Sequence, residues 1–374
     1  MGINMNSQIQ NRINRLTERM QQEGLDAALI TNEVNVRYLT GFTGDSTYLL
    51  LGGEIPVLLS DGRYESQIAS QCPGFEARIR SPSDLLPDLT REALKSIRHG
   101  TTQKATVGIE AQHLSLASYR KLIDGITAVS FVETLGLVET LRMIKDDSEI
   151  ATTRFAVKVA QEAFSEVIPQ VQANWTELEL VYALEASMRS RGAEGCSFAP
   201  IVGAGPGAAL PHYQPSDRRI GGASCLLIDW GALCDGYASD LTRTLKLSAS
   251  GDAFARAHEV VLEAQLAAIS AIKPGVSTRE VDNAAREVLR AAGMEKAFKH
   301  GLGHGVGLQI HESPRMSAVG DDPLQSGMII TVEPGVYFDG EFGIRIEDDV
   351  LVTETGCEVL SDLPKGLDDH CLML

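Results

Sequence analysis

The stretch CLLIDWGALCDGYASDLTRTLKL, residues 225–247, decides the fold of the C-terminal part of this chain. Two apolar runs flank a turn that contains Gly231 and Gly236, a pattern typical of two antiparallel strands. Asp229 lies in the first run, and Asp240 comes 11 positions later, at the start of the second run. Residues of paired strands can lie side by side on one face, where two carboxylates repel each other unless a cation compensates their charge.

Taken alone, this pair also fits a structural role, in which one aspartate caps the turn and the other pairs with Arg243. Three later stretches carry further polar residues in apolar surroundings: HGLGHGVGLQIHE at 300–312, TVEPGVYF at 331–338 and GIRIEDD at 343–349. They supply His304, Glu333 and Glu347. Four carboxylates carry four negative charges, which two divalent cations would balance. The sequence therefore predicts a dinuclear metal site, and such a site favours hydrolytic chemistry.

An internal repeat runs through the same region. A capping box, Ser or Thr followed three residues later by Glu, opens a predicted helix twice, 101 residues apart: Thr176 with Glu179, and Ser277 with Glu280. Each of these helices ends at a glycine, Gly192 or Gly293. Each also follows another helical segment, at about 149–170 and about 252–272.

A histidine and a pair of carboxylates follow each predicted helix pair. The histidines are His212 and His311, both in loop-like stretches. The carboxylates then come on two predicted strand pairs: Asp229 with Asp240, and Glu333 with Glu347. We expect the two halves to face each other across a pseudo-two-fold axis, so that each half supplies two carboxylates to one site.

A zinc site on a helix is one alternative for the histidines. His300 and His304 have the i, i+4 spacing of such a pair, but four glycines within 301–307 disfavour a helix there. The sequence HESPR at 311–315 does not form an HExxH motif, because arginine stands in the last position. The helical zinc site is therefore excluded.

A nicotinamide-dependent oxidoreductase is the alternative from another class. GAGPGA, residues 203–208, fits the motif G-x-G-x-x-A and follows a strand-like run. That motif must open a helix. Here Pro211 and Pro215 follow in a polar loop, and Pro206 lies within the motif. The dinucleotide hypothesis is therefore disfavoured, and a nucleophilic serine in G-x-S-x-G is absent from the sequence.

Composition limits the partners and the compartment. The chain has 374 residues, of which 44% are hydrophobic and 22% charged, and its formal net charge is -17. This charge argues against nucleic acid or an anionic membrane as partner, and no apolar run is long enough to span a membrane. The N-terminal stretch lacks a signal-peptide core, and the six cysteines have no CxxC spacing. We expect a cytoplasmic protein with reduced cysteines.

The N-terminal part is predicted to be a separate, mixed α/β unit. One amphipathic helix face is marked by four residues: Ile9, Ile13, Leu16 and Met20. Three apolar runs predict strands: DAALIT at 26–31, TYLLLG at 47–52 and IPVLLS at 55–60. The polar stretch 142–150 ends this unit, with Asp147 or Ser148 placed to cap the next helix. We therefore place the domain boundary between 1–145 and 146–374.

The motifs resemble those of metallopeptidase family M24, the pita-bread enzymes, which include methionine aminopeptidase, prolidase and aminopeptidase P. The resemblance is carried by DWG, SDLTRT, GHGVGLQIHE, VEPGVY and RIED, which occur in this order after residue 148. NEVNVRYLTGFTG at 32–44 and SDGRYESQ at 60–67 resemble the smaller N-terminal domain of the prolidase and aminopeptidase P branch. The resemblance implies an α+β pita-bread domain with a pseudo-two-fold repeat, behind a creatinase-like α/β domain.

The resemblance also implies a role for each metal ligand. Asp229 would bind one cation, Asp240 and Glu347 would bridge both cations, and His304 and Glu333 would complete the other. This sequence departs from the family pattern at none of the five positions. An intact set disfavours a non-catalytic binding protein of the same fold, which remains a further alternative.

Other residues match positions near the scissile bond of the family. His212 and His311 would donate hydrogen bonds to the substrate, and Glu333 would shuttle a proton. His300 matches a further histidine of the proline-specific branch, although a structural histidine is an equal alternative there. Tyr337 and Arg345 occupy positions near the substrate in that branch.

The function implied is hydrolysis of the Xaa-Pro bond at the N-terminus of peptides, by attack of a hydroxide that bridges two metal ions. Xaa-Pro aminopeptidase activity is favoured, with Xaa-Pro dipeptidase (prolidase) as the alternative. The mostly oxygen ligands favour Mn²⁺ or Co²⁺, with Zn²⁺ or Fe²⁺ as further candidates. The expected partners are peptides with proline at the second position and a second copy of this chain, in a homodimer.

Overall fold

The computed structural model describes residues 6–53, 55–95, 97, 104–124, 126–127, 129–369 and 371–372. The chain divides into two compact units, Met1–Arg142 and Met143–Leu374. We describe each unit by itself. Within the described residues, no helix is long and apolar enough to cross a membrane.

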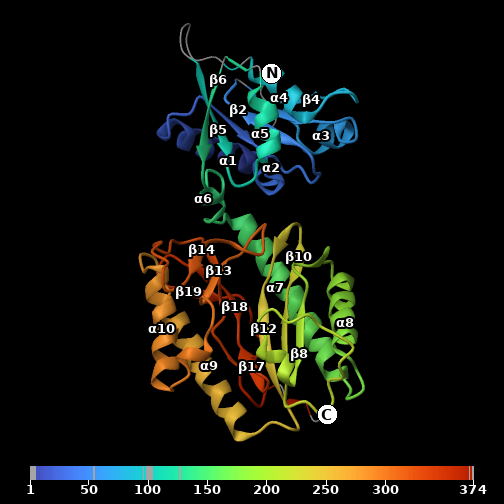
Figure 1. Ribbon diagram of the computed structural model, residues 1–374, viewed down its shortest axis with the longest axis vertical. Helices are drawn as coiled ribbons and strands as arrows, with labels where there is room; N and C mark the ends of the chain where they lie inside the picture. The colour runs from blue at the N-terminus through green and yellow to red at the C-terminus, as the bar shows by residue number, and fades with distance from the viewer. Residues whose placement is uncertain are drawn as a thin grey trace. The chain divides into compact units, whose positions relative to one another are not determined.

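Unit 1 is built on one mixed sheet of six strands in the order β4-β3-β2-β1-β5-β6 (Figure 1). The strands are β1 (Ala27–Ile30), β2 (Tyr48–Leu51), β3 (Val57–Ser60), β4 (Glu76–Ile79), β5 (Ala105–Glu110) and β6 (Val129–Thr134). β1 pairs antiparallel with β2 and parallel with β5, which makes the sheet mixed. The three apolar runs that predicted strands form β1, β2 and β3, so the α/β prediction is confirmed.

Six helices accompany this sheet: α1 (Ser7–Gln22), α2 (Glu33–Thr40), α3 (Glu65–Gln71), α4 (Leu86–Leu94), α5 (Leu116–Ile123) and α6 (Glu139–Arg142). Helix α1 is the predicted amphipathic helix. It buries Ile13, Leu16 and Met20, whereas Ile9 stays partly exposed near the first turn. The i, i+3, i+4 spacing therefore located the buried face correctly and extended it one turn too far.

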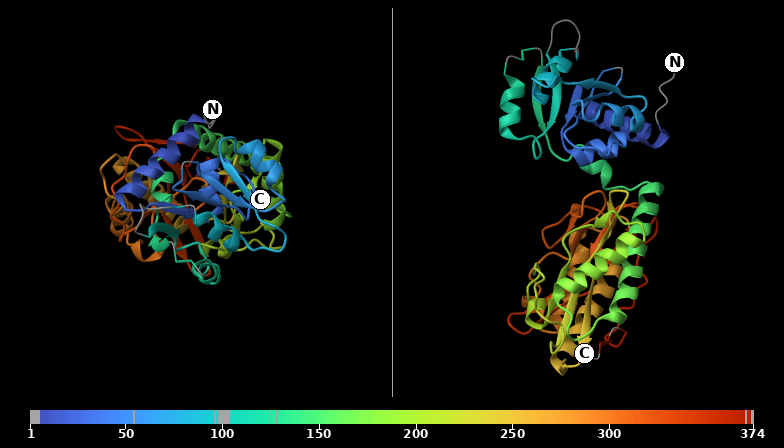
Figure 2. Two further views of the ribbon diagram at one scale, coloured as in Figure 1. Left: turned by 90° about the horizontal axis from the view of Figure 1, so that it is seen from above. Right: turned by 90° about the vertical axis from the view of Figure 1, so that its right-hand side faces the viewer.

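Two helix pairs flank the strands of unit 2, one pair on each side (Figures 1 and 2). They are α7 (Asp147–Val167) with α8 (Glu177–Ser190), and α9 (Asp252–Ala271) with α10 (Thr278–Ala291). Both predicted capping boxes form, at Thr176 before α8 and at Ser277 before α10. Gly192 and Gly293 follow these helices with φ of 101° and 75°, a conformation that glycine adopts without strain.

The start of α7 differs from the sequence prediction. Asp146, and neither Asp147 nor Ser148, is the capping residue, because its carboxylate accepts hydrogen bonds from the amides of Ser148 and Glu149. The Glu149 side chain in turn accepts from the Asp146 amide, which completes a capping box. The helix also ends earlier than expected, at Val167, and a short 3₁₀ turn continues to residue 170.

Two main sheets lie between the helix pairs, in the orders β20-β12-β9-β8 and β14-β13-β15-β18-β19. The first contains β8 (Ile201–Ala204), β9 (Cys225–Trp230), β12 (Leu241–Leu247) and β20 (Cys371–Leu372). The second contains β13 (Gly303–Gly305), β14 (Glu312–Met316), β15 (Ile329–Val332), β18 (Asp348–Val352) and β19 (Cys357–Val359). In each sheet the central antiparallel pair, β9 with β12 or β15 with β18, follows a helix pair, as the predicted repeat requires.

Two smaller sheets and, besides η1 (Ile168–Gln170) after α7, two further 3₁₀ helices complete the described part of unit 2. The three-stranded sheet joins β7 (Gly195–Cys196), β10 (Ala232–Cys234) and β11 (Tyr237–Ala238), and the hairpin joins β16 (Gly335–Phe338) and β17 (Phe342–Arg345). The 3₁₀ helices are η2 (Gly205–Ala209) and η3 (Glu295–Ala297). No α-helix follows GAGPGA among the described residues, so the dinucleotide motif lacks the helix it needs.

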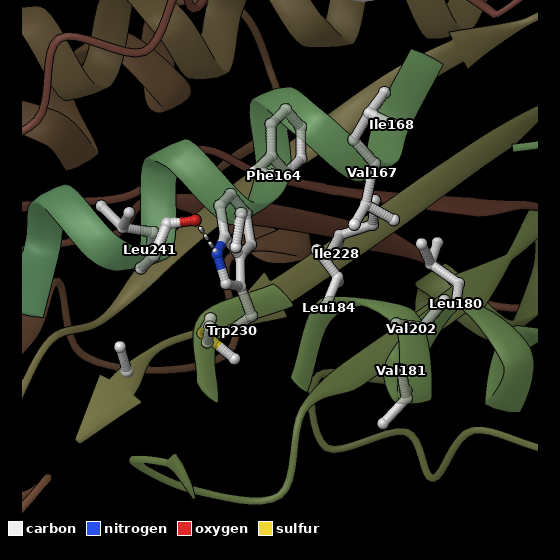
Figure 3. Close-up of a cluster of buried hydrophobic side chains, with 14 of the residues drawn as sticks. Phe164, Val167, Ile168, Leu180, Val181, Leu184, Val202, Ile228, Trp230 and Leu241 are labelled. Carbon is white, nitrogen blue, oxygen red and sulfur yellow. Dashed lines mark hydrogen bonds between the residues drawn. The ribbon is translucent and has the colours of Figure 1, made fainter. Parts of the chain in front are cut away.

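One aromatic pair is central to the core between α7, α8 and β9 (Figure 3). The ring of Trp230 stacks on Phe164 with the centroids 4.5 Å apart, and its Nε1 donates a hydrogen bond to the carbonyl oxygen of Ala160 at 3.0 Å. Trp230 is fully buried, and it directly follows Asp229 on β9. Core packing therefore fixes the strand that carries the first predicted metal ligand.

We predict that Trp230→Ala lowers the free energy of unfolding by about 3–5 kcal/mol, because it leaves a large cavity against Phe164. Urea denaturation followed by far-UV circular dichroism measures this change. Tyr182→Ala on α8 is the matched control, since the Tyr182 side chain is 62% exposed. Equal stabilities of the two variants would contradict the packing assigned to Trp230.

Candidate metal centre

A cavity of about 840 Å³ in unit 2 collects nine of the ten residues that the sequence singled out. Its wall contains the five predicted ligands and four further candidates: Asp229, Asp240, His304, Glu333, Glu347, His212, His300, His311 and Arg345. Tyr337, the tenth, is buried behind the wall and contacts Arg345 and His300. The predicted residues thus meet in one place, although they span more than a hundred positions in the sequence.

Strand register brings the two aspartates to one face. Asp229 on β9 lies opposite Thr242 on β12, so Asp240 is a diagonal neighbour and not the direct partner that a simple hairpin would give. The Asp240 amide donates a hydrogen bond to Oδ2 of Asp349 at 2.9 Å. This bond ties the first residue before β12 to β18 of the other sheet.

A bridge between the two sheets places Glu347. The Glu347 amide donates to the carbonyl oxygen of Thr242 at 3.1 Å. In the opposite direction, the Thr242 hydroxyl donates to Oε2 of Glu347 at 2.5 Å. The carboxylate therefore turns toward Asp240, and one atom each of Asp240, His304 and Glu347 lie within 4.8 Å of one another.

His304 enters from the glycine-rich strand β13. Its Nε2 lies 3.6 Å from Oδ2 of Asp240 and 3.5 Å from Oε1 of Glu333. Its Nδ1 lies 3.0 Å from the carbonyl oxygen of Gly305, so this nitrogen carries the proton in the neutral ring and Nε2 is free to accept or to bind a cation. Burial lowers the pKa of His304 to about 4, which keeps the ring neutral near pH 7.

The close approach of His304 depends on the glycines around it. A Cβ atom at Gly303 would lie 2.2 Å from the carbonyl oxygen of Thr331 on the neighbouring strand. A Cβ atom at Gly305 would lie 2.2 Å from the carbonyl oxygen of Ser313. The glycines therefore let β13 pass close to the backbone of its neighbours. This agrees with the prediction that the glycines at 301–307 form no helix.

Negative charge accumulates in the cavity. Burial, followed by repulsion from neighbouring carboxylates, raises the pKa of both Asp240 and Glu347 well above the usual range. Burial likewise raises the pKa of Glu333 to about 8. Oδ1 of Asp229 is buried and has no hydrogen-bond partner among the described residues. Divalent cations fit this set, because they would satisfy the orphaned oxygen and compensate the carboxylates.

Arg345 brings a buried positive charge to the wall of the cavity. Its guanidinium is buried and donates to Oδ2 of Asp229 at 2.5 Å, to the Tyr337 hydroxyl at 2.8 Å and to the Thr242 hydroxyl at 3.2 Å. The charged hydrogen bond from Arg345, whose guanidinium also contacts Tyr337 and Thr242, fixes the orientation of the Asp229 carboxylate. The opposite oxygen of Asp229, Oδ1, is the one left for a metal ion.

The structural alternative for the first hairpin paired an aspartate with Arg243, and this pairing is wrong. Arg243 is buried, forms an ion pair with Asp348 at 2.8 Å, and donates to the carbonyl oxygens of Thr242 and Glu347. Lys365 also contacts Asp348, at 2.6 Å. Burial raises the pKa of Asp348, but Arg243 and Lys365 outweigh it and lower the pKa below the usual range.

The three candidate histidines, His212, His300 and His311, all line the cavity. The ring of His311 is perpendicular to that of His304, with the centroids 4.4 Å apart. Nε2 of His300 lies 2.9 Å from the Tyr337 hydroxyl, and burial lowers the pKa of His300 to about 4. His212 is exposed and lines the cavity from the loop after η2. The catalytic roles of all three remain predictions.

Several supporting residues were not found from the sequence. Thr242 and Asp349 position two ligands, and the buried ion pair of Lys145 with Glu312, at 3.3 Å, holds the loop next to His311. One signal was available for Asp349, because two aspartates follow Glu347 inside an apolar strand. The other contacts join residues far apart in the chain, and no local pattern indicates them.

The metal-free protein should lose stability as the pH rises from about 6.5 to about 8. Over this range folded Glu333, with its pKa of about 8, holds a proton that the unfolded chain has released, so rising pH favours unfolding. The lowered pKa of His304 acts in the opposite direction, but only between about 4 and its usual 6.5. Urea denaturation should show a loss on the order of 2 kcal/mol. Glu333→Gln should reduce this slope without abolishing it, because the raised pKa values of Asp240 and Glu347 act in the same direction. A wild-type slope of zero would contradict the assignment.

Comparisons with known proteins agree with this geometry. The family model for metallopeptidase family M24 matches residues 151–354, and the model for the creatinase/prolidase N-terminal domain matches residues 12–144. Among curated relatives, the uncharacterized peptidase YqhT of Bacillus subtilis is 35% identical over 356 residues, covering 95% of this chain and 99% of the relative.

Solved structures are similar over almost the whole chain. The Xaa-Pro dipeptidase from Bacillus anthracis is 37% identical, with a TM-score of 0.91, and covers 97% of this chain and 100% of its own. The X-Pro aminopeptidase from Thermotoga maritima is 35% identical, with a TM-score of 0.85, and covers 95% of this chain and 100% of its own. The fold and the two family matches give one conclusion: the chain belongs to metallopeptidase family M24, in its pita-bread fold with a creatinase-like N-terminal domain.

Proposed function

We propose that this protein hydrolyses the bond between the first residue and a proline at the second position of a peptide, with two divalent cations bound by the five predicted ligands. One observation carries the proposal. Three buried carboxylates, the partly buried Glu333 and one neutral imidazole converge in a single cavity, and one carboxylate oxygen there has no hydrogen-bond partner among the described residues. A binding protein of the same fold would have no need to keep so much charge out of water.

The ligands divide into terminal and bridging residues in this proposal. Asp240 and Glu347 would hold both cations, Asp229 would bind one, and His304 and Glu333 would bind the other. The proximity of Asp240, His304 and Glu347 supports this division. The mostly oxygen ligands favour Mn²⁺ or Co²⁺. When bound, the cations would supply a Lewis acid for the peptide carbonyl and lower the pKa of a water molecule toward neutrality.

The chain's own residues handle the proton and the substrate. Glu333 would take a proton at a carboxylate oxygen and deliver it to the leaving proline nitrogen. His311 and His212 donate hydrogen bonds to the peptide and so stabilise the charge that develops on its carbonyl oxygen. Arg345 holds Asp229 in place from behind.

Aminopeptidase activity on longer peptides is the finer proposal, with dipeptidase activity as the alternative. The cavity of about 840 Å³ lies in the upper part of the range of small-ligand pockets, which supports room for residues beyond the proline. The alternative draws support from similarity to a protein described as an Xaa-Pro dipeptidase. A homodimer remains a prediction from the resemblance, and a cytoplasmic location remains a prediction from the composition.

Hydrolysis of Xaa-Pro-Yaa tripeptides beside Xaa-Pro dipeptides tests the function directly. After chelation, we expect no cleavage, and addition of Mn²⁺ should restore release of the N-terminal residue from the tripeptides. Ala-Ala-Ala is the control, which should be cleaved at least tenfold more slowly if proline is recognised. Cleavage of the dipeptide alone would favour Xaa-Pro dipeptidase activity over Xaa-Pro aminopeptidase activity. No cleavage of either substrate with any divalent ion would refute the proposed enzymatic function.

Asp240→Ala tests the bridging role. We expect the wild type to bind two Mn²⁺ per chain in isothermal titration calorimetry, and the variant to bind none tightly, because both cations lose a shared ligand. Hydrolysis should fall by at least about 10³-fold. Asp339→Ala is the control, since Asp339 is exposed and pairs with Lys299 on the surface. Retention of two tightly bound cations in Asp240→Ala would refute the assignment.

A further inference from the structure

Glu177 is a fully buried carboxylate at the first position of α8. Its Oε1 accepts a hydrogen bond from the amide of Ala204 at 2.9 Å. Its Oε2 accepts three more, from the Tyr213 hydroxyl at 2.9 Å, the Ser216 amide at 3.0 Å and the Ser216 hydroxyl at 2.9 Å. Four donors satisfy the carboxylate without a cation, and the positive end of the helix dipole adds to them.

Three of these four donors belong to the loop that carries His212. Tyr213, the next residue, donates its amide proton to the carbonyl oxygen of Leu210 and packs its ring on η2, where a Cβ at Gly207 would lie 3.1 Å from the ring. Its hydroxyl then reaches Glu177. The backbone of His212 is thus fixed from its C-terminal side, while its side chain lines the cavity.

The repeat shows that the fold does not require a carboxylate at this place. Thr278 is the equivalent residue, 101 positions later and also first in its helix. The backbone contacts correspond: the amide of Glu177 donates to Arg218 and that of Thr278 to Asp322, both at 3.0 Å. The buried Thr278 hydroxyl, however, has no hydrogen-bond partner among the described residues. The same backbone hydrogen bond therefore forms at Thr278, although its side chain makes no hydrogen bond to a loop among the described residues.

We infer that Glu177 is a positioning residue for His212: it fixes the loop 211–216 so that the imidazole points into the cavity. The inference rests on the proposed function for the catalytic effect, although the placement of the ring can be measured without it. Burying a carboxylate is costly, and the second half of the repeat, in which strand β14 directly follows His311, has Thr278 in its place. The buried carboxylate of Glu177 therefore holds the loop, and the loop carries His212.

A double-mutant cycle on the full-length, Mn²⁺-loaded protein tests the catalytic part. We expect Glu177→Gln to lower kcat by roughly tenfold to 100-fold, with two cations still bound. The glutamine NH2 group cannot accept a hydrogen bond, so either the three loop donors or the Ala204 amide loses its acceptor, the junction that holds the loop is weakened and His212 is displaced. In the His212→Ala background the same change should lower kcat by less than about twofold. Equal losses in both backgrounds would show a role independent of His212 and overturn the inference.

The second measurement follows the His212 ring itself, in protein labelled with ¹⁵N-histidine. Glu177→Gln, and to a smaller extent Tyr213→Phe, should shift or broaden the His212 signal and leave that of His300 unchanged. Thr278→Val is the matched control at the equivalent place of the repeat, and it should leave both signals and kcat unchanged. An unshifted His212 signal in Glu177→Gln would overturn the inference even if the wild type proved inactive, which would by itself refute only the proposed function.

Discussion

Repulsion among buried carboxylates is the constraint on which unit 2 depends. Asp240, Glu347 and Glu333 lie in a cavity where burial raises the pKa of each, and Arg345 offers a permanent positive charge against them through its ion pair with Asp229. A cluster of this kind destabilises the fold unless protons or cations occupy it. The same imbalance that weakens the metal-free protein is what would give the cations their affinity, so stability and activity share one origin.

The supporting residues show how the fold withstands this repulsion. Thr242 contacts both Glu347 and Arg345, and Arg243 donates to the carbonyl oxygen of Glu347 while pairing with Asp348. These contacts join β12 to β17, to β18 and to Glu347 between them, so the attraction of these polar groups holds together the strands that the ligand charges push apart. Trp230 adds the packing of the core directly behind Asp229.

The sequence was sufficient for the features that are local. Capping boxes at Thr176 and Ser277, the two apolar runs of the first hairpin and the glycines around His304 each follow from the conformations of a few neighbouring residues. The family resemblance assigned a role to each metal ligand. The ion pair of Arg345 with Asp229 joins residues that are 116 positions apart, and no periodicity or spacing indicates such a pair. Such long-range ion pairs could be found only from the coordinates. The pairing of Arg243 with Asp348 is another example, since the sequence offered only an aspartate of the first hairpin as its alternative partner.

The bridge between Thr242 and Glu347 has a consequence for biosynthesis. Its two residues are 105 positions apart, and Arg243 beside it also binds the carbonyl oxygen of Pro364 near the end of the chain. Contacts this distant in sequence form late in folding. On the ribosome, unit 1 can fold while synthesis of unit 2 continues, since domains fold in the order in which they emerge. The contacts around the bridge are complete only after Pro364 has emerged, so a shorter nascent chain lacks the complete centre that could bind metal ions or cleave peptides.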